Sequence, residues 1–189
     1  MSNTLLVRGS VRAVEPEAPL VTAVVSTENI ARDGAIIRAD GWVLDAYAAN
    51  PVILWGHDDA GRLPIARAIS TEIRGNELVQ VHEFDEADPL AAAILRKIRS
   101  GFINATSVRW RPGETEWQNI DGRQVLVFTR GHELLEVSYV AVPADPGALV
   151  QRADGRPLAE SFPPPVQATR NELTRVLREA ASLLTGGQS

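Results

Sequence analysis

The 189-residue sequence contains no cysteine, which excludes disulfide scaffolds, thiolate zinc sites and cysteine nucleophiles. Its three histidines, His57, His82 and His132, are scattered and lack the spacing of paired metal ligands. Glycine-rich phosphate-binding loops are also absent. We therefore expect no metal and no cofactor.

Long apolar runs and an excess of positive charge are also lacking. Nineteen Lys and Arg against 24 Asp and Glu give a formal net charge of −5, which argues against a main role in nucleic-acid binding. No apolar run approaches the length of a membrane span, and the N-terminus becomes charged too early for a secretory signal. We expect neither a nucleic acid nor a membrane as partner, and a cytosolic location.

The sequence does contain enough apolar residues, 44%, for one core of ordinary size. Val- and Thr-rich stretches, a short buried run and a Gly-Asn turn predict strands in the first half of the chain, with a short helical turn between them. The predicted strands are residues 4–14, 20–28, 52–55, 63–74 and 77–84, and the helical turn covers 42–49.

The clearest predicted helix covers residues 89–100, with Asp88 as N-cap, Pro89 at the first helical position and Gly101 just past its end. Three further strands are predicted at 102–111, 124–130 and 133–142. We therefore expect an α+β domain, a mostly antiparallel β-barrel or curled sheet with one or two packed helices.

Domain boundaries are predicted from proline content and capping signals. Residues 1–155 form the predicted folded domain, and the proline-rich residues 156–168 form a linker. A capping box from Thr169 to Glu172 opens a predicted C-terminal helix over residues 169–189.

Two residues are candidates for nucleophilic catalysis. His57 follows the buried run 52–55, so it sits where a core strand reaches the surface, a rigid platform for a reactive group. The alternative interpretation is that His57 is an ordinary histidine of a surface turn, beside Asp58 and Asp59. Ser107 lies in a predicted strand and would need a base within hydrogen-bond reach, because serine is a poor nucleophile by itself. His132 is a rival base, whereas His82 is interpreted as a half-exposed strand residue.

The segment Glu133-Leu-Leu-Glu-Val-Ser138 carries two carboxylates in an otherwise apolar strand. Regular alternation would place Leu134, Glu136 and Ser138 on one face and Glu133 on the other. A half-buried carboxylate needs a partner, either a catalytic imidazolium or an arginine such as Arg109 or Arg130. A rigid turn follows at Pro143-Ala-Asp-Pro146. Its amides are a candidate oxyanion site, although two prolines also make an ordinary turn.

Several segments in order resemble the prohead protease family of tailed bacteriophages. They are Arg32-Asp-Gly34, Asn50-Pro-Val-Ile-Leu-Trp-Gly-His-Asp58, Pro64-Ile-Ala-Arg-Ala68, Gly101-Phe-Ile-Asn-Ala-Thr-Ser-Val-Arg-Trp110, Glu133-Leu-Leu-Glu-Val-Ser-Tyr-Val140 and Val142-Pro-Ala-Asp-Pro146. The resemblance runs from about residue 20 to about residue 150. Two departures stand out: Arg109-Trp110 where many relatives have glycine and an aromatic residue, and Ala66 in place of the commoner glycine.

The resemblance implies a fold and an activity. The family is similar to the herpesvirus capsid-assembly protease, which implies a closed β-barrel with flanking helices. It also implies a serine endopeptidase with Ser107 as nucleophile, His57 as general base and Glu136 as the third member, with Glu133 as the alternative.

The same resemblance implies partners and a place of action. The implied substrates are the major capsid protein and the scaffold, together with the protease itself through self-cleavage. The implied place of action is the inside of the immature capsid, in the cytoplasm of a bacterial host. A homo-oligomer is compatible with this role.

Two alternatives remain. One is a catalytically inactive assembly or scaffolding protein with the same fold, suggested by Arg109 beside Ser107. The other is an unrelated β-barrel binding module.

Overall fold

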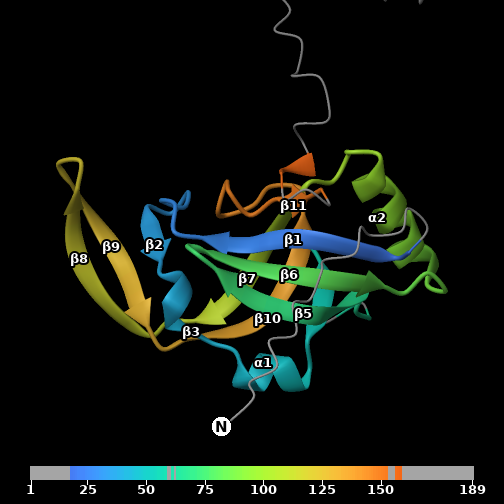
Figure 1. Ribbon diagram of the computed structural model, residues 1–189, viewed down its shortest axis with the longest axis horizontal. Coiled ribbons are helices and arrows are strands. Elements are labelled where there is room, and N and C mark those ends of the chain that lie inside the picture. Colours follow the sequence, from blue (N-terminus) through green and yellow to red (C-terminus); the bar gives the residue numbers. More distant parts are fainter. Residues whose placement is uncertain (1–17, 59–60, 62, 153–155, 159–189) are drawn as a thin grey trace, which may run out of the picture. The chain divides into compact units, whose positions relative to one another are not determined.

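The computed structural model describes residues 18–58, 61, 63–152 and 156–158 (Figure 1). All of them belong to one unit that spans Met1–Ala159. The predicted strand at 4–14, the C-terminal helix over 169–189 and most of the predicted linker lie outside the described residues, so the domain boundaries stay predictions. No helix in the described part of the chain is long and apolar enough to cross a membrane.

The larger sheet has eight strands, and seven of them follow each other in the order β11-β1-β6-β5-β4-β10-β3. The predicted strands 20–28, 52–55 and 77–84 are confirmed, and the predicted strand 63–74 begins later, at Ala66. The bounds are β1 (Leu20–Thr27), β3 (Trp42–Val43), β4 (Val52–Trp55), β5 (Ala66–Arg74), β6 (Glu77–Phe84), β10 (His132–Val140) and β11 (Val150–Gln151).

Strand β10 is the centre of this sheet at the candidate site. Along one edge it pairs in parallel with β3 and β4, and along the other it pairs antiparallel with the eighth strand, β7 (Ala105–Arg111). Its residues from Glu136 to Val140 are all buried, because strands cover both of its edges. Residues far apart in the sequence therefore meet on β10.

The predicted closed β-barrel is wrong. The strand path ends at β11 on one side and at β3 on the other, and β7 pairs with β10 alone. Next to β1, β7 is held only at its beginning, where the Thr106 hydroxyl donates to the Val24 carbonyl at 2.8 Å. No ladder joins β7 to β1 in the described part of the chain, so the sheet stays open.

A second sheet has three strands in the order β2-β9-β8, with bounds β2 (Ala35–Ile37), β8 (Glu114–Ile120) and β9 (Arg123–Arg130). Strand β9 agrees with the predicted strand 124–130. Strand β8 was not predicted, because its residues are mostly exposed and do not alternate clearly in hydrophobicity. Asp121 and Gly122 form the turn between them, and both have positive φ, as in a type I′ hairpin turn.

Helices are few among the described residues, so the fold seen there is mostly β rather than α+β. Helix α2 (Pro89–Arg99) confirms the predicted helix: the Asp88 carboxylate accepts from Leu90 N at 3.0 Å, and Pro89 occupies the first position. The predicted turn at 42–49 is divided into β3 and the short helix α1 (Asp45–Ala49), and a 3₁₀ turn, η1, covers Ala39–Gly41. The buried face of α2 packs Ile94 and Ile98 into the main core.

Candidate active site

His57 is held in a tight turn at the end of β4. Gly56 and His57 both have positive φ, 67° and 61°, and Asp58 N donates to Trp55 O at 3.3 Å across them. Gly56 N donates to Tyr139 O at 2.9 Å, which fixes the turn to β10. Positive φ is rare for a residue with a side chain and concentrates at functional sites. The backbone thus aims the imidazole by a strained conformation that the sheet maintains.

The carboxylate of Glu136 binds His57. The Nδ1 atom of His57 forms a short hydrogen bond with Glu136 Oε1, and the Glu136 side chain is only 6% exposed against 32% for His57. Because Nδ1 is engaged by the carboxylate, Nε2 is the nitrogen left for proton transfer. A buried acid that orients one side of an imidazole is the arrangement of a catalytic base and its supporting carboxylate.

Ser138 connects the two elements that carry this pair. Its hydroxyl donates to Glu136 Oε2 at 2.7 Å and accepts from His57 N at 3.0 Å. The residue is fully buried, so these bonds are not exchanged with water. Ser138 therefore fixes both the acid and the backbone of the base. Nothing in the sequence indicated a role for Ser138, because these contacts join segments about 80 residues apart.

A β-bulge in β10 corrects the expected alternation. The register with β7 shifts between Leu134 and Glu136, so Leu135 becomes an extra, exposed residue. Leu134 consequently packs in the main core with Val137 and Tyr139. The prediction that Leu134 shares a face with Glu136 is therefore wrong; the bulge turns Glu136 towards the site instead.

Ser107 lies in the middle of β7, directly opposite Ser138 of β10. Opposed residues of an antiparallel pair project from the same face, so Ser107, Ser138 and Glu136 share a face. Ser107 is 7% exposed. Within the described part of the structure its hydroxyl makes no hydrogen bond to the imidazole. In enzymes without bound substrate, the hydrogen bond between a catalytic serine and its histidine is often long, and it shortens when the substrate binds.

Arg109, which departs from the family pattern, takes part in the same cluster. Its guanidinium donates to the His57 carbonyl oxygen at 2.7 Å, and its Nε lies 3.8 Å from Glu136 Oε1. Arg109 faces Glu136 across the β7–β10 pair, which explains the approach. The side chain thus supports the main chain of the candidate base and faces the carboxylate, rather than simply covering Ser107.

The rival acid Glu133 is engaged elsewhere. It pairs with Arg111 across the β7–β10 ladder and forms a short ion pair with the Arg111 guanidinium. This is the arginine-partner alternative, although the arginine is neither Arg109 nor Arg130, the two named from the sequence. Arg130 instead binds Glu114, with Nε 2.8 Å from Oε2.

The rival base His132 is fully buried between aromatic rings. Its ring centroid lies 4.7 Å from that of Trp42 and 6.1 Å from that of Trp110. Its Nε2 donates to the Arg38 carbonyl oxygen at 2.8 Å, and burial is the main reason that its pKa is lowered. His132 is therefore a neutral packing residue and does not meet Ser107.

His82 is also fully buried, so its interpretation as a half-exposed strand residue is wrong. Its Nδ1 lies 2.8 Å from the Tyr139 hydroxyl and its Nε2 2.9 Å from Gln80 Oε1. Burial lowers its pKa to about 3, so the imidazole is neutral near pH 7. Both nitrogens are satisfied inside the core, which makes His82 a structural residue.

A groove lies beside Ser107, between β7, β1 and β2. Ala144 and Asp145 of the predicted Pro143–Pro146 turn also line it, so this turn is close to the candidate nucleophile. Apolar side chains form much of its wall. They are Val25, Ala31, Ala35, Ile37, Val108 and Trp110.

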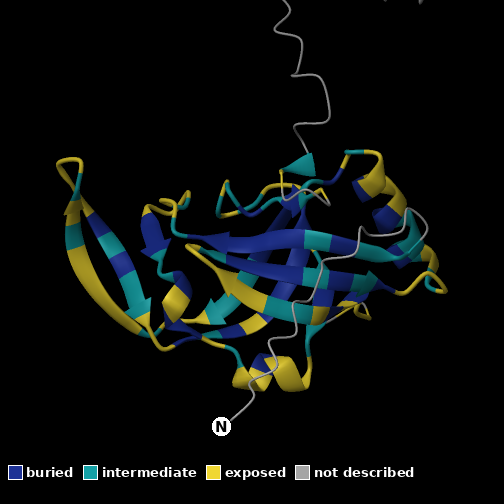
Figure 2. Ribbon diagram, viewed as in Figure 1, coloured by how far each residue is buried: buried dark blue, intermediate teal, exposed yellow. Residues whose placement is uncertain are grey.

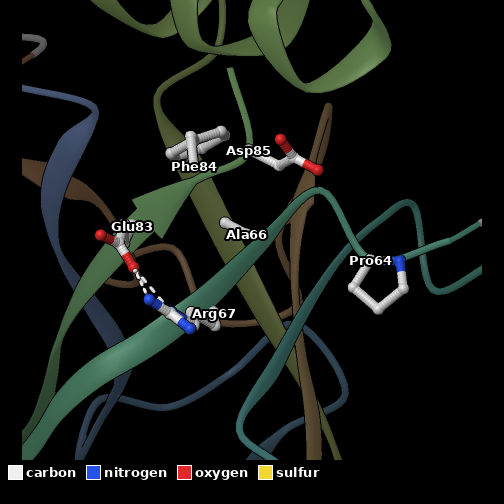
Figure 3. Close-up of a pocket in the computed structure, with 6 residues that line it drawn as sticks. All are labelled: Pro64, Ala66, Arg67, Glu83, Phe84 and Asp85. Carbon is white, nitrogen blue, oxygen red and sulfur yellow. Dashed lines mark hydrogen bonds and ion pairs between the residues drawn. The ribbon is translucent and has the colours of Figure 1, made fainter. Parts of the chain in front are cut away.

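A different hollow, near the end of β6, contains none of the candidate catalytic residues (Figure 3). Arg67 and Glu83 form an ion pair across it, with Arg67 Nε 2.6 Å from Glu83 Oε2. Ala66, the second departure from the family pattern, lines this hollow and packs in the core. The alanine therefore does not line the groove beside Ser107.

Among the residues that the structure describes, no group of three or more His, Asp or Glu side chains is arranged to hold a metal ion. At the candidate site the structure brings together serine, imidazole and carboxylate groups, with the Arg109 guanidinium beside them. That set is suited to nucleophilic attack by a hydroxyl with a histidine as general base.

Comparison with known proteins agrees with this chemistry. A family model described as caudovirus prohead serine protease matches residues 45–160. The chain belongs to this family. Within it, the chain is 34% identical over 119 residues to a protein named prohead protease from Escherichia phage T5, which covers 60% of this chain and 53% of that protein. The chain thus spans about half the length of this curated relative.

Among solved structures, the chain is similar to the bacteriophage T4 capsid assembly protease, with a TM-score of 0.48 and 12% sequence identity. The match covers 66% of this chain and 82% of that one. This likeness is distant. Membership of the prohead serine protease family rests on the family match, which includes His57, Ser107 and Glu136.

Proposed function

We propose that this protein is a serine endopeptidase in which Ser107 is the nucleophile, His57 the general base and Glu136 the acid that orients the base. The observation that carries this proposal is the Glu136–His57 hydrogen bond, formed by a buried carboxylate and a partly exposed imidazole. Ser107 lies opposite Ser138, on the same face of the β7–β10 pair as Glu136. Family membership supports the same reaction.

In the proposed reaction, Ser107 Oγ attacks the scissile carbonyl carbon while His57 Nε2 takes its proton. The imidazolium then gives that proton to the leaving amine, and an acyl-enzyme remains until water hydrolyses it. Glu136 keeps the Nδ1 proton in place and stabilises the positive charge on the ring. Backbone amides beside Ser107, with the 143–146 turn as one candidate, would bind the oxyanion.

The proposed substrates are the major capsid protein and the scaffold inside the immature capsid, together with the protease itself. This part of the proposal follows from the family and from the name of its relative in phage T5, a prohead protease. The proposed place of action is accordingly the prohead within the bacterial host.

The test is co-expression of the chain with the major capsid protein of the same phage, followed by intact-mass spectrometry of all products. The chain is compared with Ser107→Ala and with Ser70→Ala, a serine of β5 outside the site. We expect shortened capsid protein or protease with the unmodified chain and Ser70→Ala, and only full-length masses with Ser107→Ala. Full-length masses in all three, or equal cleavage in all three, would overturn the proposal.

A further inference from the structure

Strand β7 has one paired edge and one open edge, and the open edge begins beside Ser107. In the described part of the structure, β7 forms a ladder with β10 only. On its other side, Thr106 N donates to Ala148 O at 3.0 Å. Because successive backbone groups alternate between the two edges of a strand, the N–H and C=O of Val108 and Trp110 also point to that outer side. No described strand pairs with them there.

The groove beside Ser107 follows this open edge. Val108 and Trp110 line one wall, and the opposite wall comes from the end of β1 and from β2, with Val25, Ala35 and Ile37. His57 and Glu136 approach from the other side of β7, where β10 and β4 lie. The candidate nucleophile thus stands between its base and an apolar groove, where a bound substrate would lie.

Two acidic residues, Asp33 and Asp145, line the groove, and among the described lining residues there is no lysine or arginine. The Asp145 carboxylate accepts hydrogen bonds from Thr27 N at 2.6 Å and from Gly147 N at 2.8 Å, so it joins its own turn to the end of β1. Asp33 is exposed and accepts only from Ala35 N at 3.2 Å. The enclosed volume is about 50 Å³, which favours a small side chain.

We propose that the groove binds the substrate as an extended segment that adds to the open edge of β7, with the side chain next to the scissile bond small and uncharged. The backbone of the segment exchanges hydrogen bonds with Val108 and Trp110, the usual way in which an exposed strand edge binds a peptide. Asp33 disfavours an acidic side chain at this position by repulsion. This inference rests on the proposed function.

The first experiment determines cleavage preference with a peptide mixture from a digest of an unrelated proteome, analysed by mass spectrometry. Four proteins are compared: the unmodified chain, Ser107→Ala, Asp33→Lys, and Glu86→Lys as a charge-matched control at an exposed position outside the groove. We expect cleavage after small uncharged residues. Asp33→Lys is expected to raise relative cleavage after Asp or Glu about fivefold, and Glu86→Lys to leave the preference unchanged.

The second experiment tests strand addition on one peptide found in this way. Single N-methyl groups are placed at successive backbone nitrogens on the acyl side of the scissile bond, and KM and kcat are measured for each. An added strand presents alternate N–H groups to β7, so methylation at every second position should raise KM about tenfold, while the positions between are unaffected. Non-specific apolar binding would give no alternation.

The possible results separate the two proposals. Absence of any Ser107-dependent product overturns the proposed function and this inference with it. Ser107-dependent cleavage that favours acidic residues, or that Asp33→Lys and Glu86→Lys alter equally, overturns the inference about the side chain. Ser107-dependent cleavage without alternation in the N-methyl series overturns strand addition and leaves the proposed function standing.

Discussion

The two sheets differ in how they are stabilised. The eight-stranded sheet encloses a cluster of some twenty buried apolar residues, to which α2 contributes one side. The three-stranded sheet has only Ile36, Val125 and Val127 as buried members of its own cluster. Figure 2 shows the contrast: β1 and β6 are mainly buried, whereas β8 is mainly exposed.

This difference explains where the candidate site lies. A strained histidine turn and a buried carboxylate each cost free energy, and only well-packed surroundings can hold them in place. β10 supplies these surroundings at Glu136 and Ser138, because it is covered on both edges. The hairpin of β8 and β9 lacks such packing and carries none of the candidate catalytic residues.

The largest contrast is expected between the two acids of β10. Glu136→Gln should lower kcat about 10³-fold, because the amide neither stabilises the imidazolium nor keeps its tautomer. Glu133→Gln, which removes an ion pair with the largely exposed Arg111, should change kcat less than about twofold. Steady-state kinetics on one peptide substrate checks both variants, and equal losses would mean that the burial of Glu136 has no bearing on catalysis.

The two cores can be compared with a matched pair of substitutions. Val137 and Val127 are both fully buried, one in each cluster. Val137→Ala should lower the free energy of unfolding by about 2 kcal/mol, because the surrounding core cannot collapse into the cavity. Val127→Ala should cost about 1 kcal/mol, since the small cluster can relax. Urea unfolding measures both, and a larger cost for Val127 would contradict the comparison.

Acid should destabilise the larger sheet through His82. Its pKa is about 3 in the folded protein against 6.5 for a free histidine, because burial disfavours the charged ring. As the pH falls, the unfolded chain therefore binds the proton before the folded protein does. The free energy of unfolding decreases between pH 6.5 and pH 3, by at most ~1.4 kcal/mol per pH unit. In His82→Leu the free energy of unfolding should fall less steeply between pH 6 and 4. An unchanged slope would show that His82 does not contribute.

The smallest effect is expected at Trp117, in the middle of β8. It is 68% exposed, so Trp117→Ala should change the free energy of unfolding by less than about 0.5 kcal/mol and leave kcat and KM unaltered. Thermal unfolding and peptide kinetics check this. A large loss of stability would mean that the hairpin packs more tightly than its exposure indicates.

Elements with strong local signals could be predicted from the sequence. Helix α2 has a capping aspartate, a first-position proline and an apolar stripe, and it lies where these signals place it. Strand β8 could not be predicted, because an exposed edge strand needs no hydrophobic alternation. Barrel closure also failed as a prediction, since it depends on whether the first and last strands pair, which no local pattern reports.

For the candidate site, the family resemblance predicted Ser107, His57 and Glu136 as catalytic residues, which stays a prediction, and gave no sign of the residues that hold them. The roles of Ser138 and Arg109 depend on the register between β10 and β7, and the orientation of Glu136 depends on the bulge at Leu135. A register is a relation between distant segments, so residues separated by about 80 positions gave no sign of their contact.

By itself, the sequence determined which chemistry is available: without cysteine or paired metal ligands, only hydroxyl, imidazole and carboxylate groups remain. It also determined the local elements, because capping and periodicity act within a few residues. The tertiary structure alone decided which of the three histidines reaches the surface. Burial makes His82 and His132 neutral packing residues, whereas the turn at Gly56 leaves His57 partly exposed against a buried acid. Burial and pairing arise between distant segments, so only the folded chain could make that choice.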